Sequence, residues 1–412
     1  MAQPLVSLAD YIPLVGEDAV ARIREKARPL RGLHVTHVNS TYYGGGVATL
    51  LSSLTLLMND VGIKTGWRVI QGSPDFFSVT KKFHNALQGG TVNLSPRKKQ
   101  IYEHTVYENA VRNHLDHDVV IIHDPQPLPL VDHYRKRGPW VWRCHIDLTD
   151  PHPELWAYLR RWIEAYDAVI VSMPDYRQEL RTPQVVIPPA IDAFAIQNRD
   201  LSPAEVEERL AHYGIPTDRP LVVQISRFDR WKDPQGVIEA FKLAREEVPA
   251  TLALLGNVAT DDPEGEEVYR SLLDQREERI IILSRQDGAL VNALQRRAAV
   301  VFQKSTREGF GLTVAEAMWK GRPVIGGNVG GIRHQIVDGV NGFLVASVEE
   351  AAARMVELLR DQELRRELGR RARETVRDRF LMTALLERYL DLFAAFEPAF
   401  RLRDLPSSGP SG

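Results

Sequence analysis

The chain has 412 residues, too many for one average domain and enough for two. Hydrophobic residues make up 44% of it and charged residues 26%, so we expect a folded, soluble protein. The formal net charge of -2 gives no general electrostatic reason to bind nucleic acid or an anionic membrane, so any phosphate must be bound by a few placed residues.

Cysteine use and the N-terminal sequence bear on where the protein acts. Cys144 is the only cysteine, so no disulfide can form within the chain, which fits a reducing cytoplasm. Residues 1–32 lack the basic region and following apolar region of a secretion signal. The apolar segment Leu50–Met58 is short and contains hydroxyl side chains, so it does not predict a membrane span. We therefore expect a cytoplasmic protein with no membrane partner.

Strand and helix patterns alternate along most of the chain, which favours an α/β architecture with parallel sheets. In the first half, a glycine loop at Tyr42–Gly46 separates the first predicted strand from a helix predicted over Val47–Asp60. The strands predicted in this half are Leu33–Val38, Gly66–Ile70, Val119–His123, Trp140–Arg143, Ala168–Ser172 and Val185–Pro189.

The second half repeats the plan. Asp233 is predicted to cap a long amphipathic helix with Pro234 at its first position, and Ala384–Phe396 has the apolar face of a closing helix. The strands predicted here are Leu221–Ile225, Thr251–Gly256, Arg279–Leu283, Ala299–Gln303 and Pro323–Gly326. Two doubly wound sheets in tandem would place a ligand at the carboxyl ends of their strands, in a cleft between the domains.

A break in the pattern separates the halves. It falls between about Pro188 and Ser202, where a capping pattern begins a new helix. We predict an N-terminal domain over residues 1–200 and a C-terminal domain over residues 201–380. A helix in residues 381–400 should pack back on the N-terminal domain, and residues 401–412, rich in serine, glycine and proline, should be disordered.

The segment Arg307–Met318 carries more chemical information than any other. It follows an apolar strand and enters a helix predicted over Leu312–Trp319. Glu308 lies in the loop and Glu316 a little over two helical turns further on, with two glycines between them that let the backbone approach a ligand closely. Free N–H groups at the helix start favour polar or negative oxygens. This combination suits a ligand with both hydroxyls and phosphates, such as a nucleotide sugar.

A second informative group is Ser226–Pro234, which leaves the first strand of the second half. Arg227 and Lys232 would stand at the carboxyl end of that strand. A departing diphosphate needs positive charge, which Arg supplies as a bidentate clamp and Lys as a compact point charge. The plain alternative is a solvated charged loop, but the neighbouring Glu308 loop makes the phosphate role the better interpretation.

With these residues the chain resembles the retaining glycosyltransferases of family four. Glu308 and Glu316 are spaced as in the E-x7-E signature of that family, and Arg227 with Lys232 matches its diphosphate-binding pair. The resemblance covers nearly the whole chain and implies a GT-B fold, two Rossmann-like doubly wound domains that face each other across a cleft.

Within that family the chain most resembles the trehalose glycosyltransferring synthases. The segments that carry this likeness are His37–Ala48, His123–Pro127 and Trp142–Asp147. Retaining trehalose phosphorylases look similar in the same places. The resemblance therefore leaves the chemistry of the donor less certain than the family.

The resemblance implies roles for individual residues. Arg227 and Lys232 would hold the diphosphate, Glu308 would bind hydroxyls of the donor sugar, and His145 would lie beside the reacting centre. These four form the predicted catalytic set. The residues predicted to bind the donor are Gly44, Gly45, Gly46, Gly309, Phe310, Gly311, Leu312, Glu316 for the ribose and Ser284 near the base. The residues predicted to bind the acceptor are Asp124, Asp147 and Asn39.

Each assignment has a plain structural alternative. The loop Gly44–Gly46 could be only a strand-to-helix turn, and Asp124 only a turn residue. His145 at the end of an apolar strand could be a core histidine with its hydrogen bonds satisfied. Glu316 could be an ordinary exposed helix residue, although its spacing from Glu308 argues against that.

We predict no metal site and no tightly bound cofactor. The run Asp116–Asp118 resembles a D-x-D metal motif, but it precedes the strand Val119–His123 and so lies at the wrong end for a ligand. A Mg²⁺ ion could still be carried on the diphosphate without protein ligands. The histidines that lack zinc-site spacing are His117, His123, His145 and His152.

The predicted activity is transfer of glucose from a nucleoside-diphosphate glucose, such as UDP-glucose or ADP-glucose, to glucose. The product is trehalose, the reaction is reversible, and the configuration of the transferred sugar is retained. The rival activities are a retaining trehalose phosphorylase and a family-four glycosyltransferase with another acceptor. From a different class, an inactive sugar-nucleotide sensor remains open, as does assembly as a homodimer.

Overall fold

The computed structural model describes residues 5–42, 46–256 and 263–396. Contacts within the chain divide it into two compact units. Unit 1 contains Met1–Pro189 and Met382–Gly412, and unit 2 contains Ala190–Leu381. The predicted tail at 401–412 and the loop residues Gly44 and Gly45 lie outside the described residues.

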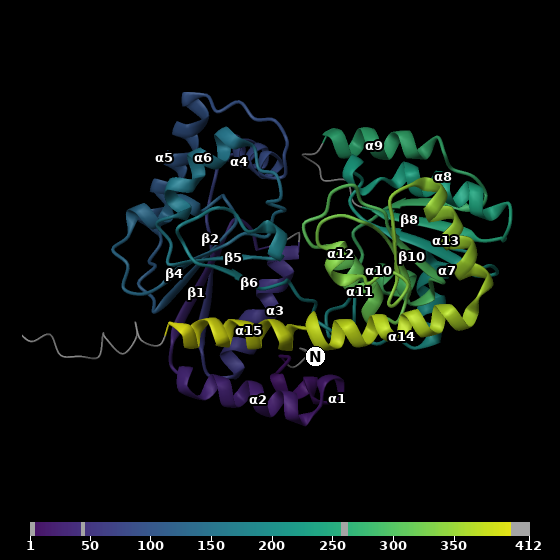
Figure 1. The fold of residues 1–412 in the computed structure, drawn as a ribbon, viewed down its shortest axis with the longest axis horizontal. Helices are drawn as coiled ribbons and strands as arrows, with labels where there is room; N and C mark the ends of the chain where they lie inside the picture. Colours follow the sequence, from purple (N-terminus) through teal and green to yellow (C-terminus); the bar gives the residue numbers. More distant parts are fainter. Residues whose placement is uncertain (1–4, 43–45, 257–262, 397–412) are drawn as a thin grey trace, which may run out of the picture. The chain divides into compact units, whose positions relative to one another are not determined.

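Unit 1 is built on a parallel sheet of six strands in the order β2-β1-β3-β4-β5-β6 (Figure 1). Its central strands are buried along their whole length, as in a sheet covered by helices on both faces. The chain reverses direction across the sheet between β1 and β3, which makes that crevice the expected ligand position. The strands are β1 (His34–Asn39), β2 (Lys64–Val69), β3 (Val119–His123), β4 (Trp140–Arg143), β5 (Ala168–Val171) and β6 (Gln184–Val186).

Helices cover both faces of this sheet. One group, α4 to α6, packs together with the 3₁₀ turn Leu128–His133, and the other brings α15 against α2 and α3 (Figure 1). The helix α15 lies in unit 1 although it follows unit 2 in the sequence, and it buries Leu385, Leu386 and Tyr389 in the core. The helices of unit 1 are α1 (Ile12–Val15), α2 (Glu17–Ala27), α3 (Gly46–Asp60), α4 (Pro74–Leu87), α5 (Pro96–Arg112), α6 (Pro153–Ile163) and α15 (Met382–Ala395).

Unit 2 has a second parallel sheet of six strands, in the order β12-β11-β10-β7-β8-β9. Read from its own first strand, this is the 3-2-1-4-5-6 order of a dinucleotide-binding fold, and its switch point lies between β7 and β10. The strands are β7 (Leu221–Ile225), β8 (Thr251–Gly256), β9 (Ile280–Ser284), β10 (Val300–Gln303), β11 (Val324–Gly327) and β12 (Phe343–Val345).

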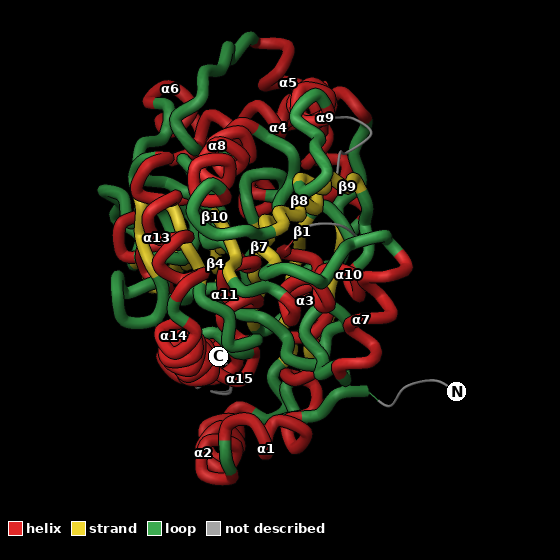
Figure 2. The backbone as a smooth tube through the Cα atoms, turned by 90° about the vertical axis from the view of Figure 1, so that its right-hand side faces the viewer, coloured by secondary structure: helices red, strands yellow, loops and turns green. Residues whose placement is uncertain are grey.

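Helices flank this sheet on both sides, as the strands and helices of Figure 2 show. The first, α7, begins at the predicted cap, where Ser202 and Glu205 exchange side-chain and backbone hydrogen bonds. The helices are α7 (Pro203–His212), α8 (Pro234–Arg245), α9 (Pro263–Leu273), α10 (Gly288–Arg297), α11 (Leu312–Trp319), α12 (Ile332–Gln335), α13 (Val348–Arg360) and α14 (Gln362–Arg379).

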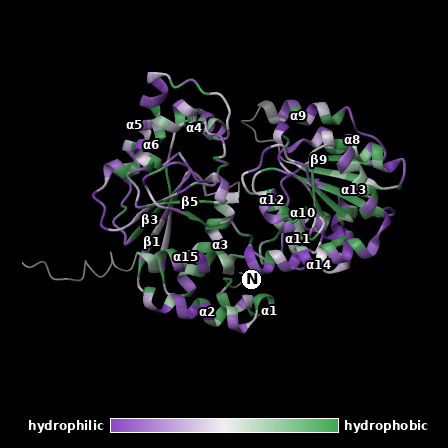
Figure 3. Cartoon of the chain, viewed as in Figure 1, coloured by the Kyte–Doolittle hydropathy of each residue, from purple (hydrophilic) through white to green (hydrophobic). Residues whose placement is uncertain are grey.

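The core of unit 2 forms where the sheet meets α8 and α13, and it contains Phe241, Leu254, Phe302 and Met355. Figure 3 shows the strands as mostly hydrophobic and the helices as mixed, which is the pattern of helices that bury one face. The predicted α/β architecture of two doubly wound parallel sheets is therefore confirmed. Among the described residues, no helix combines the length and the apolar character that a membrane crossing requires.

Candidate functional site

Two loops of unit 2 leave neighbouring strands at the switch point and are joined by a backbone hydrogen bond. The first, Ser226–Asp233, follows β7, and the second, Lys304–Gly311, follows β10. The N–H of Thr306 in the second loop donates to the carbonyl of Trp231 in the first, at 2.7 Å. The crevice where this fold type places phosphates is therefore lined by the two segments that the sequence singled out. We call them the donor loops.

An ion pair between Lys232 and Glu308 connects the donor loops. Both side chains are largely buried, at 15% and 11% exposed. The same carboxylate oxygen, Oε2 of Glu308, accepts from Gln303 Nε2 and from Ser305 Oγ, each at 3.2 Å. Three donors thus fix Glu308 in one orientation beside a fixed cation, an arrangement that can bind a sugar hydroxyl next to a phosphate.

Arg227 stands at the exposed end of the same group. Its side chain is 62% exposed, and its guanidinium pairs with Asp229 Oδ2 at 3.2 Å. The other oxygen of Asp229 accepts the backbone N–H of Lys232 at 3.1 Å, which caps the start of the short turn Arg230–Lys232. One carboxylate therefore orients Arg227 and positions Lys232, and the remaining guanidinium N–H groups can meet a diphosphate.

A second ion pair, between Lys304 and Asp233, links the donor loops again. Asp233 has φ +46°, in the left-handed region, and its side chain caps α8 by accepting from the N–H of Gly236 at 3.0 Å. Each acidic side chain of the donor loops thus has a basic partner, since Asp229 meets Arg227 and Glu308 meets Lys232. Carboxylates committed in this way are poor ligands for a resident Mg²⁺ ion.

The start of α11 brings backbone rather than side chains to the site. Gly311 caps the helix with φ +84°, which only glycine adopts without strain. The side chain of Phe310 is buried against Phe380, with 5.4 Å between ring centroids. Gly331 packs so closely that a Cβ there would lie 2.4 Å from Phe310 Cα. The predicted contribution of Gly309 to Leu312 therefore rests on their peptide groups.

Glu316 is buried on α11, at 8% exposed, beside Lys320. Burial raises the pKa of Glu316, while Lys320 and a hydrogen bond from Gln197 lower it. Lys320 Nζ donates to Asn198 Oδ1 at 2.8 Å and to Gln295 Oε1 at 2.7 Å. Glu316 is thus no exposed helix residue. The ribose contact expected of it stays a prediction.

Ser284, predicted near the base, ends β9 at the edge of the sheet. Strand β9 is separated from β10 by β8 and β7, which at about 4.8 Å per strand places it about 14 Å away. That separation suits the base end of an extended nucleotide sugar rather than its phosphates. The contact of Ser284 with the base stays a prediction.

In unit 1, His145 belongs to a chain of three imidazoles. Its Nε2 lies 2.9 Å from His123 Nδ1, and His123 Nε2 lies 2.9 Å from His37 Nδ1. His37 lies on β1 and His123 ends β3, so the switch point of unit 1 brings them together. His145 follows β4, the next strand of the sheet. His37 and His123 lie in segments that carry the family resemblance, but the sequence alone predicts no role for either side chain.

The chain of histidines sets their tautomers. Nε2 of His37 is buried and has no hydrogen-bond partner in the described part of the chain. A buried N–H without an acceptor is less tolerable than an unused lone pair. The proton of His37 therefore belongs on Nδ1, from which it donates to His123. His123 in turn donates from Nδ1 to Nε2 of His145. The proton of His145 is therefore on Nδ1, from which it can donate a hydrogen bond to a substrate oxygen.

All three histidines are held neutral. Burial is the main cause, and the Arg143 guanidinium adds to it; together they lower the pKa of His37 to about 3. They also hold the pKa values of His123 and His145 well below the usual range. Arg143 is itself fully buried and lies 5.9 Å from the centroid of the Tyr389 ring on α15. A neutral imidazole is a donor of hydrogen bonds and a poor acid here.

Asp124 positions His145 through a hydrogen bond to its backbone. It follows β3 with φ +62°, an uncommon conformation for a residue other than glycine. Its Oδ1 accepts the backbone N–H of His145 at 2.8 Å, and its carbonyl accepts from Trp142 Nε1 at 3.0 Å. Burial raises the pKa of Asp124 to about 7, against the lowering effects of the His145 N–H and Arg143. The predicted acceptor contact of Asp124 stays untested beside this positioning role.

The other residues predicted to bind the acceptor are engaged in local bonds. Asn39 Oδ1 accepts from Trp67 Nε1, and Asn39 Nδ2 donates to the carbonyl of Thr41, each at 2.8 Å. Asp147 Oδ1 accepts from the N–H and hydroxyl of Thr149 at 2.9 and 2.6 Å. Both shape the loops around the histidines. Their contact with an acceptor remains a prediction.

With this geometry in hand, comparison with known proteins identifies the family. A family model described as "Trehalose synthase, N-terminal domain" matches residues 37–178, and one described as "Glycosyl transferases group 1" matches residues 205–375. A trehalose synthase of Pyrococcus horikoshii is 45% identical over 395 residues, which are 93% of this chain and 95% of that protein. The chain belongs to the trehalose synthase family of glycosyltransferases.

Two further likenesses place this glycosyltransferase more broadly. A trehalose phosphorylase of Pleurotus pulmonarius is 27% identical over 90% of this chain but only 58% of its own length. The Anabaena protein HepE, solved in complex with UDP-glucose, superposes with a TM-score of 0.66 at 17% identity, covering 88% of this chain and all of HepE. That structural likeness concerns the fold, which is of the GT-B type with two Rossmann-like domains.

Proposed function

We propose that this glycosyltransferase moves glucose from a nucleoside-diphosphate glucose to the anomeric hydroxyl of a second glucose, forming trehalose reversibly. The observation that carries the proposal is the cationic group on the donor loops, where Arg227 and the Lys232–Glu308 pair meet at the switch point. A diphosphate and a sugar hydroxyl are the partners that such a group fits. The trehalose synthase of Pyrococcus horikoshii supports the choice of product.

Each part of the donor loops has a task in this proposal. Arg227 and Lys232 stabilise the charge that develops on the departing diphosphate. Glu308, held by Lys232, Gln303 and Ser305, accepts hydrogen bonds from the donor sugar and orients it. A carboxylate fixed in this way is not free to approach the anomeric carbon as a nucleophile. Retention would then follow from attack on the face that the diphosphate leaves, with the phosphate taking the proton of the acceptor.

Unit 1 would supply the acceptor side of the reaction. The Nδ1–H that the histidine chain leaves on His145 is a donor for a sugar hydroxyl. Asp124, through the backbone of His145, fixes where that donor stands. A Mg²⁺ ion, if present, would arrive on the diphosphate, because the carboxylates of the donor loops already have basic partners.

A trehalose phosphorylase is the second candidate, favoured by the Pleurotus pulmonarius relative. It would use inorganic phosphate where the synthase uses a nucleoside diphosphate. The synthase is preferred because the Pyrococcus horikoshii relative matches over 95% of its length and at higher identity, whereas the phosphorylase matches over only 58% of its own.

A direct assay tests the proposal. The protein is incubated with UDP-glucose or ADP-glucose and glucose, and the products are separated to look for a non-reducing disaccharide together with the free nucleoside diphosphate. Equal amounts of both products support the synthase. Cleavage of trehalose that depends on inorganic phosphate and needs no nucleotide would instead establish the phosphorylase. Release of glucose from the donor without disaccharide would contradict both transfer reactions.

A further inference from the structure

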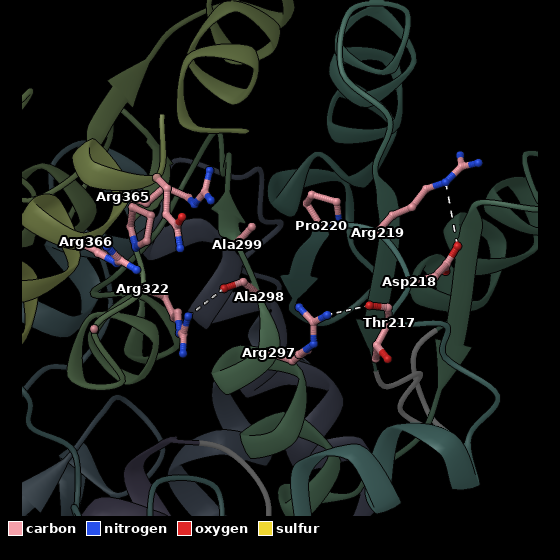
Figure 4. A pocket seen from close by; sticks show the side chains of 13 residues that line it. Thr217, Asp218, Arg219, Pro220, Arg297, Ala298, Ala299, Arg322, Arg365 and Arg366 are labelled. Carbon is pink, nitrogen blue, oxygen red and sulfur yellow. Dashed lines mark hydrogen bonds and ion pairs between the residues drawn. The ribbon is translucent and has the colours of Figure 1, made fainter. Parts of the chain in front are cut away.

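A pocket lined by arginines lies at the amino-terminal ends of the unit 2 strands, whereas the donor loops follow the carboxyl ends (Figure 4). Its volume is about 480 Å³. It is formed where the chain enters β7, β10 and β11, together with the first turn of α14. The donor loops follow the other ends of β7 and β10. At about 3.3 Å per residue the five residues of β7 separate the two sites by about 17 Å.

The charge of this basic pocket is strongly unbalanced. Among the described residues that line it, Asp218 is the only acidic one; it is paired with Arg279 at 2.8 Å and lies 4.0 Å from Arg219. Arg297 has an acidic partner outside the lining, Glu207, at 3.2 Å. Figure 4 shows Arg322, Arg365 and Arg366 on one side and Arg297 facing them, while Arg219 points away toward Asp218. The arginines that line it are Arg219, Arg297, Arg322, Arg365 and Arg366.

The excess of positive charge is most marked at Arg322. Its guanidinium donates to the carbonyl of Ala298 at 3.3 Å, while its buried Nε has no hydrogen-bond partner in the described part of the chain. No acidic side chain of the described residues lies within ion-pair distance of it, but Arg296, Arg297 and Arg365 lie near. Burial and these like charges lower the pKa of Arg322. A half-buried cation among like charges is costly unless an anion joins it.

Two neighbouring arginines, Arg365 and Arg366, also lack a close acidic partner among the described residues. In the described part of the chain, Arg365 donates to the carbonyls of Leu358 and Leu359, at the end of α13, and to no carboxylate. Arg366 is 67% exposed and meets Glu363 only at 3.5 Å. A surface of ordinary solvated arginines would show neither the buried unpaired Nε nor a concave wall. These guanidinium groups form planar forks that match the geometry of phosphate oxygens.

We propose that the basic pocket is a binding site for an anion that carries a phosphate group, separate from the nucleotide-sugar site. Its volume is sufficient for inorganic phosphate or for a small phosphate ester, and Pro220, Ala298 and Ala299 supply an apolar wall for an organic part. Because the pocket shares no residue with the donor loops, the anion and a nucleotide bind at the same time. The proposal stands whether or not the synthase activity does.

A bound anion would also have an effect on the helices. The turn containing Arg322 ends α11, the helix whose first residues complete the donor loops, and Arg365 lies in the first turn of α14. An anion bridging the two arginines connects these helices, which already pack against each other. A bound anion would therefore stabilise unit 2 and the donor loop that precedes α11.

The test compares thermal unfolding with inorganic phosphate and with sodium chloride at the same ionic strength. The variants are Arg322→Gln and Arg366→Gln, and the matched control is Arg370→Gln, an exposed arginine further along α14 that pairs with Glu367. Phosphate should raise the unfolding midpoint of the wild type and the control by about 2–4 °C. Both pocket variants should lose that rise. Arg366 is exposed, so its variant remains informative even if Arg322→Gln folds poorly.

An Arg227→Ala variant separates the pocket from the donor loops. The proposal requires that this variant keep the phosphate-induced rise. It is overturned if phosphate has no effect on the wild type, or if Arg227→Ala abolishes the effect while the pocket variants retain it. Calorimetric titration with phosphate and with glycerol 3-phosphate then identifies the source, since tighter binding of the ester indicates a phosphorylated metabolite and tighter binding of phosphate indicates the free ion.

Discussion

Nδ1 of His123 lies 2.9 Å from Nε2 of His145, so a histidine on one strand orients the ring of a histidine that follows the next. His123 touches His37 in the same way on its other side, and neither partner is exposed. The relationship makes His123 a positioning residue for His145 in the proposed reaction. It also explains why a buried polar side chain occupies the end of an otherwise apolar strand.

Replacement of His123 by Phe should therefore lower kcat about 10- to 100-fold with a smaller change in KM, because His145 loses the partner that fixes its tautomer. The ¹⁵N shifts of the His145 ring should show a mixture of tautomers in the variant and one tautomer in the wild type. The exposed His104→Ala serves as a control. An unchanged His145 spectrum would contradict the positioning role.

The cations of the donor loops should matter most for turnover. Arg227→Ala and Lys232→Ala should each lower kcat about 10²- to 10³-fold, since each removes charge that stabilises the departing diphosphate. Arg230→Ala is the matched control, because Arg230 lies in the same loop and pairs with Glu267 instead. Circular dichroism should show all three variants folded. Near-normal turnover in both Arg227→Ala and Lys232→Ala would refute the assignment.

Chelation of divalent metals should leave most of the activity in place. The acidic residues of the donor loops are paired with Arg227, Lys232 and Lys304, so the loops supply the positive charge themselves. The measurement is the rate of disaccharide formation in the presence and absence of EDTA. Complete loss of activity that Mg²⁺ restores would show that a metal ion supplies an indispensable part of that charge.

Asp124 should give stability an unusual dependence on pH. Its pKa is raised to about 7 in the folded chain, above the ordinary value of 3.8. The stabilising effect of its bound proton is fully present below pH 3.8 and is lost as the pH rises to about 7. Wild type should therefore lose stability across that window relative to Asp124→Asn. The difference has an upper limit of about 4 kcal/mol, and residual solvent exposure of the carboxyl reduces it.

Urea unfolding of both proteins at several pH values measures this difference. Asp150→Asn, which removes an exposed carboxyl of the same unit, provides the control and should follow the wild type. Parallel stability curves for wild type and Asp124→Asn would show that the Asp124 carboxyl is ionised throughout the window.

Gly331→Ala should damage the donor loops through the backbone. Its Cβ would lie 2.4 Å from Phe310 Cα and 2.8 Å from the carbonyl oxygen of Gly309, so the loop must move. We expect a raised KM for the nucleotide sugar and a loss of about 1–3 kcal/mol in stability. Gly66→Ala is the control, because the nearest atom to its Cβ is 3.9 Å away. Unchanged kinetics would show that the loop can move aside without affecting nucleotide-sugar binding.

Much of the fold could be predicted because its strands are buried on both faces. Continuous apolar runs such as Val119–His123 and Leu221–Ile225 appear in the structure with the predicted bounds. Helix α11, between Gly311 and Gly321, also has its predicted bounds. Strand β12 was missed because Phe343–Val345 is too short to show a period.

Less of the candidate site could be predicted from the sequence, because its residues come together only in the folded sheet. The pairing of Lys232 with Glu308 follows from motifs at the ends of adjacent strands. The contribution of His37 does not, because a histidine inside a buried strand looks like any core residue until β1 is known to lie beside β3. The basic pocket is harder still, since the sheet order and the packing of α14 against α11 bring the segments at Arg219, Arg322 and Arg365 together.

The place of α15 has a consequence for how the chain is made. The ring of Tyr389 on this helix lies 6.0 Å from His37 and close to Arg143, so the last helix helps to enclose the histidine chain formed by β1 and β3. During synthesis, residues 190–381 leave the ribosome with both of their ends already available, and that unit can fold at once. Unit 1 begins first but cannot be completed until α15 emerges, after the whole of unit 2.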